Sequence, residues 1–162
     1  MEKALFTIGI FAGIFNSKGE LLLRRRDCEP YLGKWELPGG AVLKSHLEIG
    51  DERAIGKALQ ERILDEIGVS ISPQRMPAMY PTIPKKGDDI AFAVIIGIFH
   101  ENTLFRGEAE FVSLEKLVFL AEYEELVSGK QRMYRMCLRM FASRDCPNSK
   151  YREEAGYLLS RL

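Results

Sequence analysis

The segment "ALQERILDEIGV" at residues 58–69, with "WELPGG" at residues 35–40 before it, decides the fold of this chain. Aliphatic residues recur at every fourth position and charged residues lie between them: Ile55, Leu59, Ile63 and Ile67. This period predicts an amphipathic helix over residues 51–67. Gly68 follows directly and is typical of the residue that ends a helix.

The same helix carries three acidic residues close together, Glu61, Asp65 and Glu66. Residues three and four apart stand on one helix face, and Mg²⁺ or Mn²⁺ prefers several carboxylate oxygens that converge. Arg62 lies among them and would repel a cation if it faced the same way. In a second arrangement Glu61 and Asp65 hold the ion and Arg62 pairs with Glu66. A third interpretation stays open, because "QERILDE" is also typical of a solvated helix face.

The remainder of the chain predicts strands, then this helix, then strands, then helices. We expect strands at residues 4–15 and 20–26, joined by a turn at "NSKG", and a loop over residues 27–50. Residues 74–84 contain prolines and are expected to be irregular, whereas 89–99 and 109–114 are expected to be strands. Helices are expected at 113–121, 128–144 and 148–162, the last capped by Ser149. This order predicts an α/β or α+β domain.

Composition restricts the class of protein further. The chain has 162 residues, of which 46% are apolar, and this suits a single domain over residues 1–162. The 23 basic and 23 acidic residues balance, so neither nucleic acid nor an anionic membrane is expected as a partner. The apolar N-terminal run is too short to span a bilayer. Three cysteines without metal-ligand spacing suit a reducing, cytoplasmic environment.

"WELPGG" followed by "ALQERILDEIGV" resembles the signature of the Nudix hydrolase family. Gly40 matches the first glycine of that signature, and residues 61–69 match its end. "GELLLRRR" and "EFVSLEKL" are also similar to family strands, so the resemblance covers roughly residues 5–120. Two features depart from the signature. The Arg–Glu pair is inverted to Glu61–Arg62, and the longer spacing leaves the first glutamate without a clear counterpart among Glu48, Asp51 and Glu52.

The resemblance implies a Nudix-type α/β/α sandwich around a mixed sheet. It also implies metal-dependent hydrolysis of the pyrophosphate linkage of a nucleoside diphosphate derivative, with Mg²⁺ or Mn²⁺ as cofactor. On the helix it implies Asp65 and Glu66 as metal ligands, and a carbonyl at Gly40 is a further candidate. Glu61 is added as a ligand candidate by the second helix arrangement. Asp65 and Glu66 also become catalytic candidates, and Glu110 is a further candidate as general base or ligand, with Glu108 as its competitor.

Substrate contacts are expected upstream of the helix. Arg24 and Arg26 end the second strand, and a planar guanidinium suits phosphate oxygens; the alternative is an ordinary solvated strand end. Gly39 and Gly40 let the backbone approach a bound group closely. The ligand is therefore expected to be a nucleotide or another small molecule that contains pyrophosphate.

Two other functions stay open at this point. A degenerate Nudix domain would bind a nucleotide or a protein partner without hydrolysing it. A purely structural domain would use the C-terminal helices as its interaction surface. The sequence fixes neither the substrate, for which residues 80–89 are the expected specificity loop, nor whether the chain forms an oligomer.

Overall fold

The computed structural model describes residues 6–41, 54–71, 78–82, 90–99 and 104–162. Seven strands in these ranges form one sheet: β1 (Phe6–Phe15), β2 (Leu21–Arg25), β3 (Trp35–Glu36), β4 (Gly39–Ala41), β5 (Ala78–Thr82), β6 (Ile90–Phe99) and β7 (Ala109–Val112). The strand order is β3-β2-β1-β6-β5, and in addition β4 pairs with β1 and β7 with β2. The sheet is mixed, as expected, because β1 and β6 are parallel while the other pairs are antiparallel.

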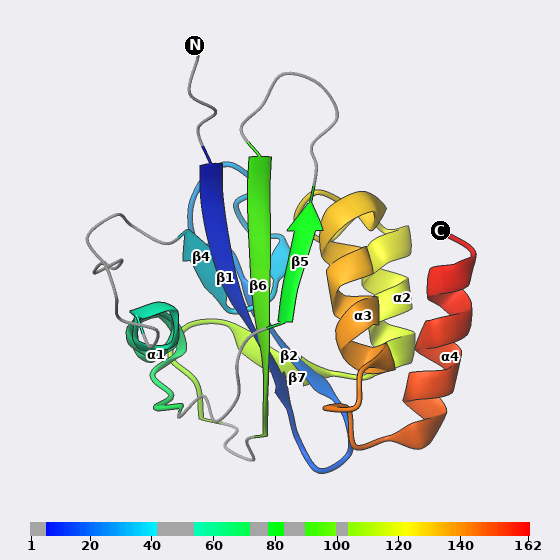
Figure 1. Ribbon diagram of the computed structural model, residues 1–162. Coiled ribbons are helices and arrows are strands. Elements are labelled where there is room, and N and C mark those ends of the chain that lie inside the picture. The colour runs from blue at the N-terminus through cyan, green and yellow to red at the C-terminus, as the bar shows by residue number, and fades with distance from the viewer. Residues whose placement is uncertain (1–5, 42–53, 72–77, 83–89, 100–103) are drawn as a thin grey trace.

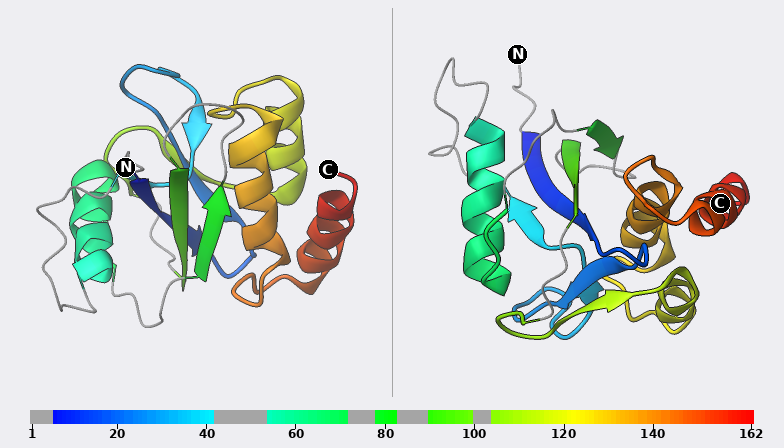
Figure 2. Two further views of the ribbon diagram at one scale, coloured as in Figure 1. Left: turned by 45° about the horizontal axis from the view of Figure 1, so that its top comes forward. Right: turned by 90° about the horizontal axis from the view of Figure 1, so that it is seen from below.

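Helices cover both faces of this sheet (Figures 1 and 2). Of the helices that the structure describes, only α1 (Ala54–Ile67) lies on one side. Helices α2 (Leu114–Glu122), α3 (Arg135–Ala142) and α4 (Ser149–Ser160) lie on the other, and a π-helical turn, η2 (Lys130–Tyr134), leads into α3. The arrangement confirms the predicted α/β/α sandwich.

Each face of the sheet has its own hydrophobic core. On the α1 side, Leu59, Ile63 and Ile67 are at most 1% exposed and pack against β1 and β2 residues such as Ile10 and Leu22. On the other side, alternate strand residues pack against the C-terminal helices: Phe15, Leu21, Leu23 and Val112. Because successive strand residues point to opposite faces, the same strands supply both cores.

The hairpin between β1 and β2 is fixed by Asn16, which confirms the predicted turn. Its Oδ1 accepts hydrogen bonds from the N–H groups of Lys18 and Glu20, at 3.1 and 3.0 Å. Asn148 then ties this turn to the C-terminal part of the chain, because its Nδ2 donates to the Lys18 carbonyl at 3.2 Å. Asn148 is also the N-cap of α4 and accepts from the N–H of Tyr151, so the prediction that Ser149 caps this helix is wrong.

Two expected irregular segments contain strands. Residues 27–50 include β3 and β4, and residues 74–84 include β5. The first two strands have two and three residues, too few for a periodic pattern to be visible, and they form because β2 and β1 pair with them. β5 contains Pro81 and, among the described strands, pairs with β6 alone at the end of the strand order, where a missing N–H is tolerated.

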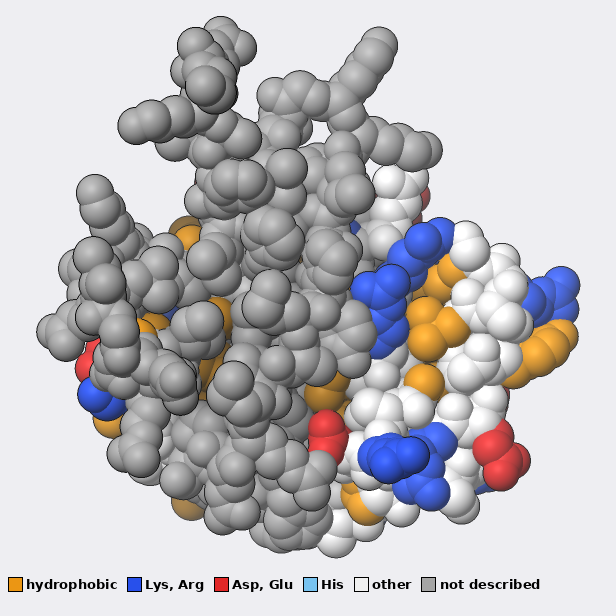
Figure 3. All heavy atoms as spheres, viewed as in Figure 1, with side chains coloured by type: hydrophobic (Ala, Val, Ile, Leu, Met, Phe, Trp, Pro, Cys, Tyr) orange, Lys and Arg blue, Asp and Glu red, His pale blue; other side chains and the backbone are white. Residues whose placement is uncertain are grey.

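On the surface in Figure 3, lysine and arginine side chains stand out over the C-terminal helices, with apolar side chains between them. No helix in the described ranges is both long and apolar enough to cross a membrane.

Candidate active site

Glu66 is the centre of a charged cluster between α1 and the sheet. Its Oε2 accepts a hydrogen bond from the N–H of Gly39 at 2.9 Å. Its Oε1 lies 3.0 Å from Nε of Arg62 and 3.4 Å from Nη2 of Arg24. The carboxylate is only 10% exposed, so it meets two cations and one backbone donor in a largely dry environment.

Burial and the neighbouring positive charges shift the pKa of Glu66 in opposite directions. Desolvation raises the pKa of this carboxyl above its ordinary value, because burial disfavours the ionised form. Arg24, the Gly39 N–H and Arg62 lower the pKa, and Glu36 raises it again, but the net shift is upward. Without the two arginines, an ionised carboxylate at this position would be strongly disfavoured.

Arg24 and Glu36 connect this cluster to the sheet. Arg24 on β2 lies opposite Glu36 on β3, and its Nη2 donates to Glu36 Oε1 at 2.9 Å. The other oxygen of Glu36 accepts from Nη1 of Arg26 at 3.1 Å. Both Arg24 and Glu36 are buried, so this pair is fixed in place rather than exchanging with water. It holds the Arg24 guanidinium beside Glu66.

Gly39 and Gly40 bring the backbone close to the cluster. Gly39 has φ of 141°, and a Cβ there would come within 2.1 Å of the carbonyl oxygen of Ile10. Only glycine fits this position, and its N–H is thereby directed at Glu66. At Gly40 the nearest side chain is Arg62, whose Nη2 would be 2.6 Å from an added Cβ. Arg62 therefore lies against the glycine pair.

Solved structures share this arrangement of sheet and helices. A MutT protein from Methanosarcina mazei Go1 matches with a TM-score of 0.58 and 22% identity over 86% of this chain and 97% of that one. The NUDIX domain of Shewanella oneidensis NrtR, solved with ADP ribose, matches with a TM-score of 0.60 and 12% identity, over 85% and 86% of the two chains. The chain has the Nudix fold.

A third solved structure with this fold is larger. It is a bifunctional NMN adenylyltransferase/ADP ribose pyrophosphatase from Francisella tularensis, complexed with AMP and a Mn ion. The TM-score is 0.54 with 13% identity, and the match covers 99% of this chain but 43% of that protein. No protein-family model matches the chain, and no curated protein matches it in sequence.

Within the Nudix fold, several residues expected at the site come together. Glu66, Gly39, Arg24 and Arg26 belong to one network of direct contacts or shared partners, and Gly40 adjoins it through Arg62. Asp65 and Glu61 are exposed on α1, and the Asp65 carbonyl accepts from Nη1 of Arg106 at 3.1 Å. Arg62 thus faces the glycine pair and also pairs with Glu66, and the latter contact is the one expected in the second arrangement.

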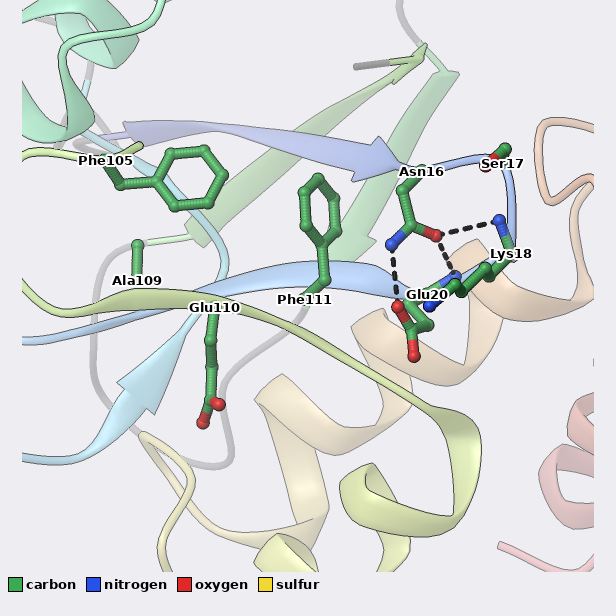
Figure 4. Close-up of a pocket in the computed structure, with 8 residues that line it drawn as sticks. All are labelled: Asn16, Ser17, Lys18, Glu20, Phe105, Ala109, Glu110 and Phe111. Atoms are coloured by element: carbon green, nitrogen blue, oxygen red, sulfur yellow. Dashed lines mark hydrogen bonds between the residues drawn. The ribbon is translucent and has the colours of Figure 1, made fainter. Parts of the chain in front are cut away.

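Glu110 lies elsewhere. On β7 it is opposite Leu23, a residue of the core beneath the C-terminal helices, and its carboxylate pairs with Lys116 at 2.7 Å. A pocket of about 360 Å³ lies beside it, and Figure 4 shows Phe105 and Phe111 on one side of the strand and Glu110 pointing away on the other. The structure therefore does not bring Glu110 close to Glu66. Glu108 lies on the same side of the sheet as Glu110, because residues two apart along a strand point the same way.

The described residues do not fit a divalent ion at α1. No group of three His, Cys, Asp or Glu side chains in these ranges converges to hold a metal. Glu66 already has two guanidinium partners and a backbone donor, and Arg62 lies where a third carboxylate would be needed. The upstream candidates Glu48, Asp51 and Glu52 lie outside the described residues.

Glu36 was not predicted from the sequence as a residue of this site. This residue lies within "WELPGG" and is 3% exposed, and it forms ion pairs with both Arg24 and Arg26. A signal was present, since a lone acidic residue between two apolar neighbours, three residues before a glycine pair, suggests a buried partner for a cation. The pairing with Arg24 depended on the register of β3, which is too short to predict.

Proposed function

We propose that this chain is a Nudix-type hydrolase that cleaves the pyrophosphate linkage of a nucleoside diphosphate derivative. The observation that carries the proposal is the cluster of Gly39, Arg24, Arg62 and Glu66 at the junction of α1 and β4 in a Nudix fold. Guanidinium groups bind phosphate oxygens through paired, charge-assisted hydrogen bonds. ADP ribose and AMP in solved structures of this fold support the ligand class.

The chain's own residues would act mainly by binding and orientation. Cleavage of a phosphoanhydride requires the phosphate charge to be neutralised and water to be placed in line with the leaving group. Arg24 and Arg62 supply positive charge, and the buried Arg24–Glu36 pair keeps one of them fixed. The family resemblance implies Mg²⁺ or Mn²⁺, but the residues at α1 do not fit such an ion, and we derive no step through it.

A second candidate is a Nudix domain that binds the same ligand class without hydrolysing it. The contact between Arg62 and Glu66 favours it, because this contact occupies a carboxylate that the family uses for catalysis. The two candidates predict the same ligand. They differ in whether the bound ligand is converted to products.

A panel assay separates the two. Nucleoside triphosphates, dinucleoside polyphosphates, nucleotide sugars and dinucleotide cofactors are incubated with Mg²⁺, with Mn²⁺ or with a chelator, and phosphate, pyrophosphate and nucleotide products are measured. We expect turnover of at least one class, and Glu66→Gln should lower it by about a hundredfold or more. Glu110→Gln is the comparison variant, and its carboxylate on the far side of β7 predicts a much smaller loss.

Binding of a panel member without products would replace the hydrolase with the binding-only candidate. A Glu110→Gln variant that loses as much turnover as Glu66→Gln, with an unchanged melting temperature, would return Glu110 to the catalytic site. Absence of both binding and products across the panel would reject the two candidates together.

A further inference from the structure

A guanidinium group lies next to Gly40 and Glu66, where the family resemblance implies a divalent ion. Nη2 of Arg62 lies so close to Gly40 that a Cβ there would be 2.6 Å away, and Nε of the same residue donates to Glu66 Oε1 at 3.0 Å. Nη2 of Arg24 approaches the same oxygen at 3.4 Å. Two arginines from different elements thus converge on one carboxylate, beside a backbone that only glycine can form.

We propose that Arg62, supported by Arg24, binds the pyrophosphate of the ligand in place of a divalent ion, so that binding requires no metal. The inference rests on the proposed function only for the class of ligand. Its physical basis is that the site already contains the positive charge that a metal would bring to the phosphates. Among the residues that the structure describes, a hard cation would meet two guanidinium groups there and no group of converging carboxylates.

The two arginines differ in exposure and in how firmly their partners hold them, and this difference assigns their roles. The Arg24 side chain is 10% exposed and is held by Glu36, whereas the Arg62 side chain is 46% exposed. Within the described ranges, Arg62 forms one ion pair, with Glu66 one helical turn away, and such a pair is a weak interaction at a half-exposed position. Arg62 can therefore turn toward a phosphate.

Glu66 would keep its stabilising partners when Arg62 turns away. Arg24 and the Gly39 N–H still face the two oxygens of its carboxylate. Arg24 also has an unused donor, because its buried Nε has no hydrogen-bond partner in the described part of the chain. The cluster can thus exchange one contact for a ligand without leaving a buried charge uncompensated.

The first experiment measures binding of inorganic pyrophosphate by calorimetry in a chelating buffer. We expect saturable binding to the wild type, and Arg62→Gln should weaken it by about tenfold or more, as expected for loss of a charge-assisted contact. Arg25→Gln is the matched control. It removes the same charge from the residue that follows Arg24 on β2, whose side chain pairs with Glu108 and lies over Trp35 on the other side of the sheet. Melting curves check that all variants fold.

The second experiment titrates Mn²⁺ alone, without any phosphate ligand. The wild type should bind Mn²⁺ weakly, and Arg62→Glu should bind it about tenfold more tightly or better, because residues 62, 65 and 66 then supply three carboxylates on one face. Tight Mn²⁺ binding by the wild type that Glu66→Gln abolishes would overturn the inference. Pyrophosphate binding that needs Mn²⁺ would also overturn the inference. A wild type that does not bind pyrophosphate at all would overturn it as well.

These outcomes are distinct from failure of the proposed function. Turnover in the nucleotide panel that stops in the chelator, together with tight Mn²⁺ binding by the wild type, would reject the arginine site and keep the hydrolase. Metal-free pyrophosphate binding that depends on Arg62, without turnover of any panel member, would keep the arginine site and reject the hydrolase.

Discussion

At the scale of single residues, the glycine pair shows how one backbone position can serve both fold and site. Gly39 has no room for a side chain, because an added Cβ would meet the Ile10 carbonyl and the Cα of Phe11. At Gly40 the added Cβ would meet only the end of the Arg62 side chain, which can move. Adjacent glycines of one motif are therefore needed for different reasons.

This difference predicts unequal effects of the same substitution. Gly39→Ala should lower the free energy of unfolding by about 2 kcal/mol or more, since it combines a positive φ with a clash against backbone. Gly40→Ala should lower it by about 1 kcal/mol or less, because only the Arg62 guanidinium must shift. Chemical denaturation of both variants checks the order. Equal losses would show that the backbone at Gly39 can relax, contrary to the structure.

At the scale of elements, the start of α2 is fixed by its own side chains. Ser113 is the N-cap, and its hydroxyl accepts from the N–H of Lys116 at 3.2 Å. Glu115 in the first turn has its pKa lowered, chiefly by a hydrogen bond from its own N–H and by the Ser113 hydroxyl. The Tyr151 hydroxyl also donates to Glu115 at 3.3 Å, so the cap of α2 contacts α4.

The lowered pKa of Glu115 predicts a pH-dependent contribution to stability. The folded state favours the ionised carboxylate, so the stabilisation is present above the ordinary carboxyl pKa and is lost as pH falls through the lowered one. Glu115→Gln should therefore reduce the melting temperature near pH 7 and have little effect at about pH 2.5. Glu122→Gln, at the other end of α2, is the control and should not reproduce this loss. A loss that is equal at both pH values would refute the assignment.

Removal of the cap itself is a separate test of the same element. Ser113→Ala leaves the Lys116 N–H without its side-chain acceptor and should lower the free energy of unfolding by about 1 kcal/mol. Chemical denaturation at neutral pH measures this loss of free energy of unfolding. Ser149→Ala is the comparison, because Asn148 and not Ser149 caps α4, and its effect should be small. A larger loss in Ser149→Ala would restore the cap predicted from the sequence.

At the scale of the whole molecule, long periodic segments were predictable and short paired ones were not. The period of the aliphatic residues gave α1 and its buried face, and the apolar run gave β6. β3 and β4 exist only because distant strands pair with them. The same limit applies to the site. The motif suggested that Glu66 and the glycine pair belong to one site, whereas the partners of Glu36 could be known only from the register of β2 and β3.

The cysteines test whether the C-terminal helices pack with the sheet as one unit. Cys137 on α3 and Cys146 before α4 are buried in the core that also contains β1 and β2 residues, whereas Cys28 is exposed. Burial raises the pKa of both core thiols, which further suppresses the reactive thiolate. In the native protein at about pH 8, we expect an aromatic disulfide reagent to modify Cys28 rapidly and the other two only after unfolding. Cys28→Ser should remove the fast reaction and leave two slow thiols. Fast modification of Cys137 or Cys146 at native pH and without denaturant would mean that the helices open independently of the sheet, and the chain would then not behave as the single domain that its length and composition predict.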